Sequence, residues 1–197
     1  MGEGPRQFVC RTDGKDDIVF VDEAWSRFAR DNWRPDFDPS LVLGRSLWSF
    51  VSEPATRQIL GRLCERLRST GRGLTLPFRC DSPDRRRHME MTVEVTERGG
   101  LLWRSHLLAE EARPAVDLLR QVNPLEDRLL VMCSWCKRVL PPEWLPGVQA
   151  PVGQETWLEV EEMLPDLAAM GQGFFPNLSH GICQACHDRV MASLVAL

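Results

Sequence analysis

The first third of the chain alternates short β-prone runs with apolar residues at helical spacing. Two such runs, residues 8–11 and 18–21, flank Asp13-Gly14, a dipeptide that favours a tight turn between antiparallel strands. Apolar side chains then recur every three or four residues over 22–33, which predicts a helix. Its core-facing positions are Trp25, Phe28, Ala29 and Trp33. The pattern therefore predicts a β-hairpin followed by a helix.

A longer amphipathic segment comes next, and three strand-like segments follow it. Ser52 is a suitable N-cap and Pro54 fits a first turn, so we expect a helix from there to Thr70, ended by Gly71 and Gly73. Its apolar stripe consists of Ile59, Leu60, Leu63 and Leu67. Alternation of period two then predicts strands over residues 74–80, 88–96 and 101–109. Mixed strands and helices in this order indicate an α+β fold.

This order of elements, and three segments within it, resemble a PAS domain over residues 8–109. The segments are IVFVDEAWSRF (18–28), LGRSLWSF (43–50) and PFRCDSP (77–83). The resemblance implies a five-stranded antiparallel sheet with helices on one face, used as a sensor or dimerisation module that takes an unidentified small ligand. Leu47 stands where the light-sensing flavin branch of the family has its reactive cysteine, and the long helix has no histidine for haem. The resemblance therefore implies neither cofactor, and the cofactor-binding residues of this domain stay unassigned.

Charge divides the chain near residue 112. Residues 1–112 hold 18 Lys and Arg against 18 Asp and Glu, whereas residues 113–197 hold 6 against 10. The stretch around Pro114 is polar, as domain edges often are, and the apolar spacing over 116–122 predicts a connecting helix. We therefore expect a PAS-like domain over 1–112, a linker helix within 113–128, and a smaller domain over 129–197.

Four of the seven cysteines form two CxxC pairs in the predicted smaller domain: Cys133, Cys136, Cys183 and Cys186. The chain shows no apolar signal segment at its start and no apolar run of membrane-spanning length, so we expect a cytoplasmic protein with reduced thiols. Two thiolates separated by two residues can point at one ion from a tight loop. Two such pairs supply the four ligands of a closed tetrahedral Zn²⁺ site.

The 46 residues between the two pairs contain a further helical pattern. It covers residues 156–170, and Pro165 is expected to kink or split the helix. Its apolar face consists of Trp157, Val160, Met163, Leu164 and Leu167. Zinc would act as a staple here, because a domain of roughly 80 residues has only a modest core of its own.

The C-terminal half also resembles a small module that is attached to bacterial PAS, response-regulator and histidine-kinase proteins. The likeness runs from Met132 to about Val190 and rests on CSWCKR (133–138), a WxxVEE helix and SHGICxxC (179–186). Residues 140–153 look longer than in that module, and Gln184-Ala185 replaces its usual Pro-acidic pair. The resemblance implies a metal-binding accessory module that carries no established catalytic activity.

Other interpretations of the cysteines stay open. His180 could replace one cysteine as a ligand or donate a hydrogen bond to a sulfur. Four thiolates also suit an iron–sulfur cluster, and a CxxC pair alone suits a dithiol redox enzyme. Cys183-Gln-Ala-Cys186-His187 satisfies the attachment pattern of c-type haem. A zinc site could itself serve as a redox switch that loses its metal when the thiolates are oxidised.

The remaining charged clusters predict solvated surface. The arginines at 85–87 read as a hairpin end, and Glu155, Glu159, Glu161 and Glu162 read as an exposed helix face. Only six Lys and Arg lie beyond residue 112, which disfavours nucleic acid as a partner. The sequence contains no P-loop, GxSxG, HExxH or dinucleotide fingerprint, so we assign no catalytic residues. We expect a non-enzymatic signalling protein that acts through a protein partner and forms a homodimer by default.

Overall fold

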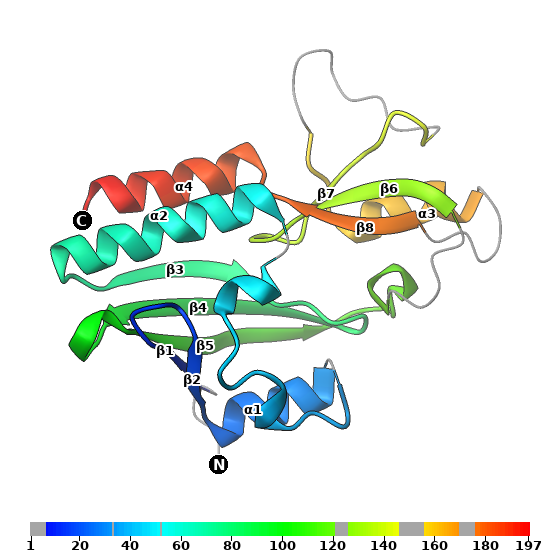
Figure 1. Cartoon of the computed structure of the whole chain (residues 1–197). Helices are drawn as coiled ribbons and strands as arrows, with labels where there is room; N and C mark the ends of the chain where they lie inside the picture. The colour runs from blue at the N-terminus through cyan, green and yellow to red at the C-terminus, as the bar shows by residue number, and fades with distance from the viewer. Residues whose placement is uncertain (1–6, 33, 52, 121–125, 146–155, 170–175) are drawn as a thin grey trace.

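The computed structural model describes residues 7–32, 34–51, 53–120, 126–145, 156–169 and 176–197. Within these ranges the chain forms an α+β fold with two sheets (Figure 1). The larger, N-terminal sheet holds β1 (Gln7–Thr12), β2 (Ile18–Val21), β3 (Leu74–Arg79), β4 (Arg85–Val95) and β5 (Leu101–Ala112). The helices are α1 (Glu23–Asn32), α2 (Pro54–Thr70), α3 (Val160–Ala169) and α4 (Gln184–Val195), with short 3-10 turns at Pro39–Leu41, Leu47–Phe50, Glu97–Gly99 and Asp117–Arg120.

The N-terminal sheet has the strand order β2-β1-β5-β4-β3 and is antiparallel throughout. This confirms the five-stranded antiparallel sheet that the resemblance implies, and we call it the PAS-like sheet after that resemblance. One face of the sheet is apolar because the strand residues alternate, and its buried side chains include Leu76, Val93, Leu101 and Trp103. Helix α2 packs on this face through Ile59, Leu63 and Leu67, and α1 packs on the same face through the Phe8–Phe28 ring contact.

Helix α2 begins and ends close to the predicted positions. Its N-cap is Glu53, whose carboxylate accepts the N–H of Ala55 at 2.8 Å, whereas Ser52, the expected cap, lies outside the described residues. Pro54 occupies the first turn, as predicted. Gly71 ends the helix in the left-handed conformation (φ 68°), which a residue without Cβ adopts at little cost. Trp33, which the sequence places on the core face of the first helix, also lies outside the described residues.

The smaller sheet consists of β6 (Glu126–Cys133), β7 (Val139–Leu140) and β8 (Pro176–Gly181), in the order β7-β6-β8. Strands β6 and β8 run parallel, and β7 is antiparallel to β6. Its core is formed by Leu130, Met132, Val139, Val160 and Met163, with Val116, Leu118, Leu145 and Leu167. Three of the predicted helix-face residues, Val160, Met163 and Leu167, are thus buried there.

Two expectations about the C-terminal half need correction. Between β5 and β6, the described part of the predicted linker helix is a single 3-10 turn, Asp117–Arg120, and β6 already begins at Glu126. The helix expected over 156–170 is shorter, because Trp157 and Leu158 precede α3 and Leu158 instead forms a bridge with Val139. Helix α3 continues through Pro165 rather than ending there.

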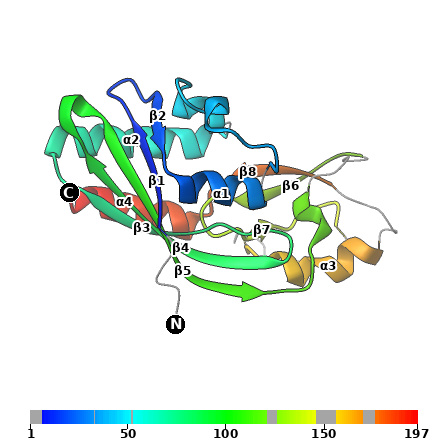
Figure 2. The same ribbon diagram turned by 90° about the horizontal axis from the view of Figure 1, so that it is seen from below.

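One hydrophobic core joins the two sheets. It combines α2 and the PAS-like sheet with Cys133, Trp135, Cys183 and Cys186 and with Val190 and Leu194 of α4. Helices α2 and α4 pack together, and both views place them side by side (Figures 1 and 2). The predicted division into domains is not tested by this packing, but any boundary between them crosses a shared core. In the part of the chain that the structure describes, no helix has both the length and the hydrophobicity to cross a membrane.

Candidate metal centre

The two CxxC pairs meet because of the parallel strands β6 and β8. Parallel strands end at the same edge of a sheet, and Cys133, the last residue of β6, pairs with Gly181, the last residue of β8. A Cβ on Gly181 would lie only 3.1 Å from the Val131 side chain, so a larger residue would force that side chain to shift. The Ser-His-Gly segment before Cys183 is therefore a strand that aligns the second pair with the first.

The first cysteine pair lies on a tight loop held by its own backbone. The Cys133 N–H donates to the Arg138 carbonyl at 2.7 Å, and the Lys137 N–H donates to the Cys133 carbonyl at 3.0 Å. Lys137 takes a left-handed conformation (φ 61°), which closes the turn. The Ser134 N–H donates to the Gly181 carbonyl at 2.8 Å and ties this loop to β8.

The second pair begins α4. Cys183 is the N-cap residue, and its carbonyl accepts the His187 N–H at 2.9 Å. Cys186 lies in the first turn of the helix and is buried. This geometry places the second CxxC at a helix N-terminus, where the helix dipole and the free backbone N–H groups favour negative charge on sulfur.

The four sulfurs form a single cluster. The Sγ atoms of Cys133, Cys136, Cys183 and Cys186 all lie within 4.8 Å of one another. The Sγ atoms of Cys136 and Cys183 are 3.8 Å apart, and the Cys183 N–H donates to the Cys133 Sγ at 3.4 Å. Tetrahedral zinc with Zn–S bonds of about 2.3 Å places its sulfurs about 3.8 Å apart, whereas a disulfide joins them at about 2.05 Å. The residues therefore fit one tetrahedral ion.

Hydrogen bonds between the sulfurs shift the pKa values of the cluster cysteines in opposite directions. Hydrogen bonds from the thiols of Cys136 and Cys186 strongly lower the pKa of Cys133. The same contact with Cys133 raises the pKa of Cys136 to about 11 and raises the pKa of Cys186 further. Without a cation, the thiols of Cys136 and Cys186 thus stabilise a thiolate at Cys133. A divalent cation would allow all four to be thiolates.

The other three cysteines have a different environment. Burial raises the pKa of Cys10 to about 11 and that of Cys64 to about 12, and burial also raises the pKa of Cys80. These thiols are protonated at neutral pH and lack the neighbouring sulfurs that could share an ion. We therefore expect thiolates only among the four clustered cysteines.

The structure also places the residues of the alternative interpretations. His180 lies in β8 opposite Met132, and in the described part of the chain it makes no hydrogen bond to a cysteine sulfur. His187 instead contacts Asp188, with Nδ1 3.1 Å from the Asp188 Oδ1. An iron–sulfur cluster, with iron and sulfide atoms between its thiolates, requires wider sulfur spacing than this group provides. Thioether attachment of haem at Cys183 and Cys186 would leave Cys133 and Cys136 packed against it without a role.

The cysteine loop contacts the PAS-like sheet directly. Thr56 of α2 donates its hydroxyl to the Ser134 hydroxyl at 3.0 Å, and the Arg79 N–H at the end of β3 donates to the Trp135 carbonyl at 2.8 Å. Trp135, between the two cysteines, is only 6% exposed and packs in the shared core. The loop that carries half of the candidate ligands is therefore part of the N-terminal core.

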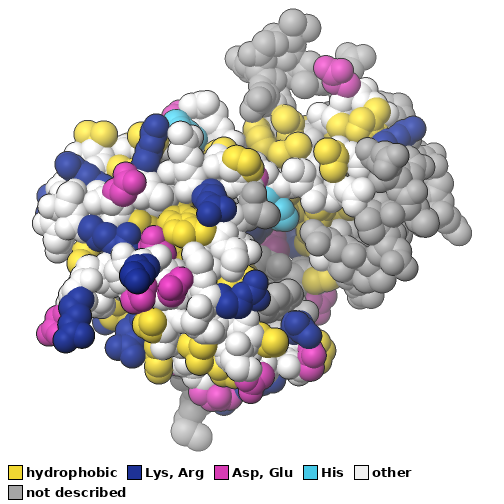
Figure 3. Space-filling view, viewed as in Figure 1, with side chains coloured by type: hydrophobic (Ala, Val, Ile, Leu, Met, Phe, Trp, Pro, Cys, Tyr) yellow, Lys and Arg dark blue, Asp and Glu magenta, His cyan; other side chains and the backbone are white. Residues whose placement is uncertain are grey.

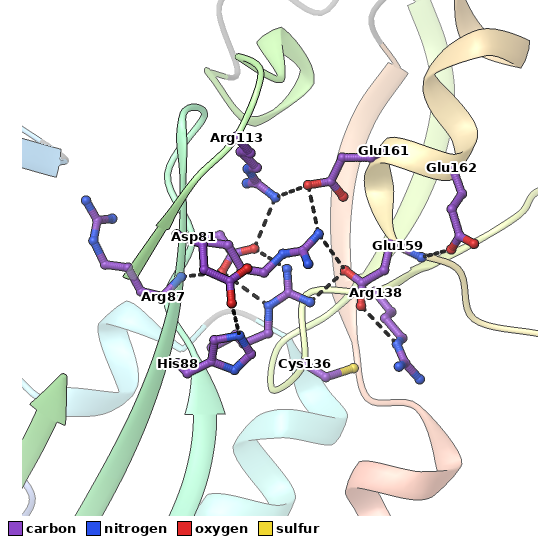
Figure 4. A network of polar contacts seen from close by, with 12 residues as sticks. Asp81, Arg87, His88, Arg113, Cys136, Arg138, Glu159, Glu161 and Glu162 are labelled. Atoms are coloured by element: carbon purple, nitrogen blue, oxygen red, sulfur yellow. Dashed lines mark hydrogen bonds and ion pairs between the residues drawn. The ribbon is translucent and has the colours of Figure 1, made fainter. Parts of the chain in front are cut away.

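A second set of polar contacts joins the two sheets, and sequence reasoning missed it (Figure 4). Arg79 makes two contacts with Asp81 and donates to the Glu159 carboxylate at 2.7 Å. Arg113 lies 3.3 Å from Asp81 and 2.9 Å from Glu161. Arginines from the ends of β3 and β5 thus bind carboxylates at the start of α3.

This network, which we call the arginine–glutamate network, corrects two predictions. Residues 85–87 do follow the turn of the β3–β4 hairpin, and Arg85 is half-exposed there, but Arg86 donates to Glu161 at 3.0 Å and Arg87 is buried, so these two arginines are not solvated surface. Glu159 and Glu161 accept from arginines, so they are not an exposed helix face; Glu159 also accepts from Arg138 at 3.2 Å. Glu162 is exposed, as predicted, and Glu155 lies outside the described residues. The one sequence signal is complementary charge: four arginines within 79–87 and three glutamates within 159–162.

The network lowers the pKa values of Glu159 and Glu161. Burial alone would raise the pKa of Glu159, but the hydrogen bond and charge of Arg79 outweigh it and lower the pKa below its usual value. For Glu161 burial likewise acts upward, and a backbone hydrogen bond together with Arg113 brings the pKa down. Both groups therefore stabilise the fold above their ordinary pKa, and that contribution is lost as the pH falls through the lowered values.

Comparison with known proteins adds little to this geometry. No family model and no curated protein matches the chain. Among solved structures, it is similar to the crystal structure of a domain of HTR-like protein from Haloarcula marismortui ATCC 43049, at 14% identity and a TM-score of 0.35. The match covers 53% of this chain and 99% of that chain. A TM-score of this size carries no argument, and the fold assignment rests on the strands and helices themselves.

Proposed function

We propose that this is a non-enzymatic signalling protein of bacterial type, in which a PAS-like sensor domain is coupled to a zinc module. Cys133, Cys136, Cys183 and Cys186 would hold one Zn²⁺, which supplies cross-linking of the two loops rather than reactivity. The protein would act in the cytoplasm through contacts with a protein partner, as a homodimer by default. Nucleic acid is not an expected partner, and Lys/Arg and Asp/Glu side chains are interspersed on the face drawn in Figure 3.

One observation carries this proposal: the candidate ligands and α2 share a hydrophobic core. Cys133 and Cys183 pack with Ile59 and Leu63 of α2, which in turn cover the apolar face of the PAS-like sheet. A rearrangement of α2 on the sheet would therefore reach the cysteine loop and the N-terminus of α4 without passing through the segment at 113–128. Coupling through packed side chains suits a regulatory protein whose output is a change of shape.

Metal analysis tests the proposal most directly. Protein purified without added metal should contain one zinc per chain and show no visible absorbance. Cys133→Ser should lose the metal, whereas Cys10→Ser should keep it, because Cys10 lies in the PAS-like sheet away from the cluster. Iron with visible bands would contradict the zinc assignment, and so would metal-free protein with a disulfide between cluster cysteines.

A redox switch is the second candidate, favoured by the exposure of one ligand. Cys136 is half-buried, whereas Cys133, Cys183 and Cys186 are buried, so oxidants would meet Cys136 first. Titration of the zinc-loaded protein with hydrogen peroxide, with released zinc measured by a chelating dye, distinguishes the two roles. A structural site should release zinc slowly and only with large excess of peroxide, and a switch should release it rapidly near stoichiometric amounts.

A further inference from the structure

A cavity of about 770 Å³ lies between α1 and the ends of β1, β4 and β5. Helix α1, which supplies part of its lining, lies well away from α4 in Figure 1. Its apolar wall is formed by Phe8, Phe28 and Leu107, and charged side chains line the rest. Its volume is within the range of small-molecule sites.

Arg87 is the buried charge of this cavity. It is 8% exposed and its guanidinium lies over the Phe28 ring, 5.3 Å from the ring centroid. Its Nε donates to Glu110 at 2.6 Å, but its Nη1 is buried with no hydrogen-bond partner among the described residues. Figure 4 shows its side chain pointing away from the arginine–glutamate network. A guanidinium keeps its charge in proteins, so a buried N–H without an acceptor is a cost that a ligand oxygen could remove.

Charges of both signs lie on the α1 wall of the cavity. Arg27 and Asp31 lie one turn apart on α1 and both line the cavity. Neither makes an ion pair or a side-chain hydrogen bond within the described part of the chain. The full lining has three arginines and three carboxylates, Arg27, Arg85 and Arg87 with Asp31, Asp84 and Glu110. A ligand with charge of only one sign would meet repulsion here, whereas a ligand with both signs would find a partner for each.

We propose that this cavity binds a small zwitterion with an apolar side chain, an apolar amino acid or dipeptide. Its carboxylate would be held by Arg87 and Arg27, its ammonium group would face Asp31, and its side chain would pack against Phe8 and Phe28. The inference rests on the proposed function in one respect: the bound zwitterion would be the signal that the PAS-like sensor domain detects. Binding itself does not require the metal.

The test is isothermal titration of the full chain with probes that differ in charge. L-Phenylalanine and L-alanyl-L-phenylalanine carry both charges, 3-phenylpropionate lacks the ammonium group, and phenethylamine lacks the carboxylate. At least one zwitterion should bind with a Kd below about 1 mM, and each half-charged analogue should bind at least tenfold more weakly. The two zwitterions compared with each other decide between an amino acid and a dipeptide.

Variants assign the binding to this cavity. Arg87→Met should weaken binding of the zwitterion at least tenfold, and Asp31→Asn should weaken the zwitterion while leaving 3-phenylpropionate unchanged. Because Arg87 also packs on Phe28, Ala24→Phe provides a second obstruction that fills the cavity from α1 without removing a buried charge. The matched control is Arg11→Met, since Arg11 likewise lies over a phenylalanine ring, at 4.8 Å from Phe20, but does not line the cavity.

Several results would overturn the proposal. They are the absence of binding by every probe, equal binding of 3-phenylpropionate and the zwitterions, or binding that Arg87→Met, Asp31→Asn and Ala24→Phe all leave intact. Zinc content is measured on the same samples. Zinc-free protein that binds phenylalanine would contradict the zinc module alone, and zinc-loaded protein that binds no probe would contradict the ligand assignment alone.

Discussion

Two joints hold the C-terminal part of this chain against the PAS-like sheet, and they differ in their chemistry. The first is the cysteine loop, where Trp135 and the cluster cysteines pack with α2 and α4 in an apolar core. The second is the arginine–glutamate network between the ends of β3 and β5 and the start of α3. The first joint depends on buried apolar area and, in the proposed function, on a metal. The second depends on ion pairs between buried or half-buried charges.

This difference predicts which joint contributes most to the free energy of folding and which one sets the position of α3. A structural zinc site contributes on the order of 10 kcal/mol to folding, and burial of apolar side chains adds to it. Buried ion pairs contribute little net stability, because the desolvation of the charges offsets their attraction. In the described residues, Arg86 Nε, Arg113 Nε and Glu161 Oε2 even lack partners. We therefore expect the cysteine joint to hold the two parts together and the network to set the position of α3.

Removal of the metal should break the first joint and give the largest effect. Without the ion, no metal–sulfur bond links the four sulfurs, which lie in or against a core that α2 and α4 share. Hydrogen exchange of chelator-treated protein should show protection falling by about two orders of magnitude or more in α2 and α4, since the stabilisation by metal is far larger than that. Amides of β1 and β2 should change much less, because these strands contribute to a separate small cluster with α1.

A change in hydrogen exchange confined to the cysteine segments would show that the metal site and α2 are not coupled. If exchange increased only in the segments around the four cysteines, and α2 stayed fully protected, the shared core would not transmit the state of the metal site. The proposed coupling between sensor and zinc module would then be wrong, although the zinc site itself could stand. Re-addition of zinc should restore protection and serves as the internal control.

Substitution of Arg79 should break the second joint with an intermediate effect. Arg79 is 8% exposed, and Arg79→Met would leave Asp81 and Glu159 without their main partner. Loss of one partner of a buried ion pair costs about 3–5 kcal/mol, which denaturant unfolding at neutral pH would measure. The matched control is Arg34→Met, since Arg34 pairs with Asp36 at the surface and exposed pairs contribute about 0–1 kcal/mol.

The double variant sharpens this result. In Arg79→Met/Glu159→Gln the orphaned carboxylate at 159 becomes a neutral amide, so the second substitution should cost less than it does alone. Additive costs would mean that Arg79 and Glu159 do not interact, and an Arg79→Met cost as small as that of Arg34→Met would remove the network as a joint. Zinc content should stay unchanged in each of these variants, because none of them removes a cysteine and Glu159 reaches the cysteine loop only through the exposed side chain of Arg138.

The sequence predicted the cysteine group of the first joint, but not its packing against α2, and it predicted the second joint wrongly, for a physical reason. Each CxxC pair is local: the spacing of Cys133 and Cys136, or of Cys183 and Cys186, can be seen within four consecutive residues. That spacing alone predicts that the two thiols of a pair bind the same metal ion. The contacts of Arg79 and Arg86 with Glu159 and Glu161 join residues 75 to 80 positions apart. Viewed locally, three consecutive arginines or a glutamate-rich helix start look like solvated surface, and only the tertiary fold brings them together.

Within the fold, the same distinction separates what the sequence predicted from what it missed. The strands of the PAS-like sheet follow from alternation and from turns such as Asp13-Gly14, their assembly into one antiparallel sheet was implied by the resemblance, and α2 follows from its apolar stripe. The parallel pairing of β6 with β8 was missed, because Pro176–Gly181 has neither alternation nor a run of apolar residues. This strand is recognisable only in the folded structure, where His180 pairs with Met132 and Gly181 approaches the Val131 side chain closely.

The hydrogen bond between Thr56 and Ser134 gives the smallest expected effect and the sharpest test of how the first joint works. Thr56→Val keeps the shape of the side chain but removes the donor to the Ser134 hydroxyl at 3.0 Å. Such a bond is worth about 1 kcal/mol, or roughly 2–4 °C in the melting temperature of a protein of this size. The control is Thr75→Val, since Thr75 makes the same kind of bond to Thr92, at 2.9 Å, on an exposed position of the sheet. The loss should appear in zinc-loaded protein and vanish after chelation, because the metal shapes the loop that presents Ser134. An equal loss in both states would mean that the loop keeps its conformation without the metal, and that the α2 contact rather than the ion holds it in place.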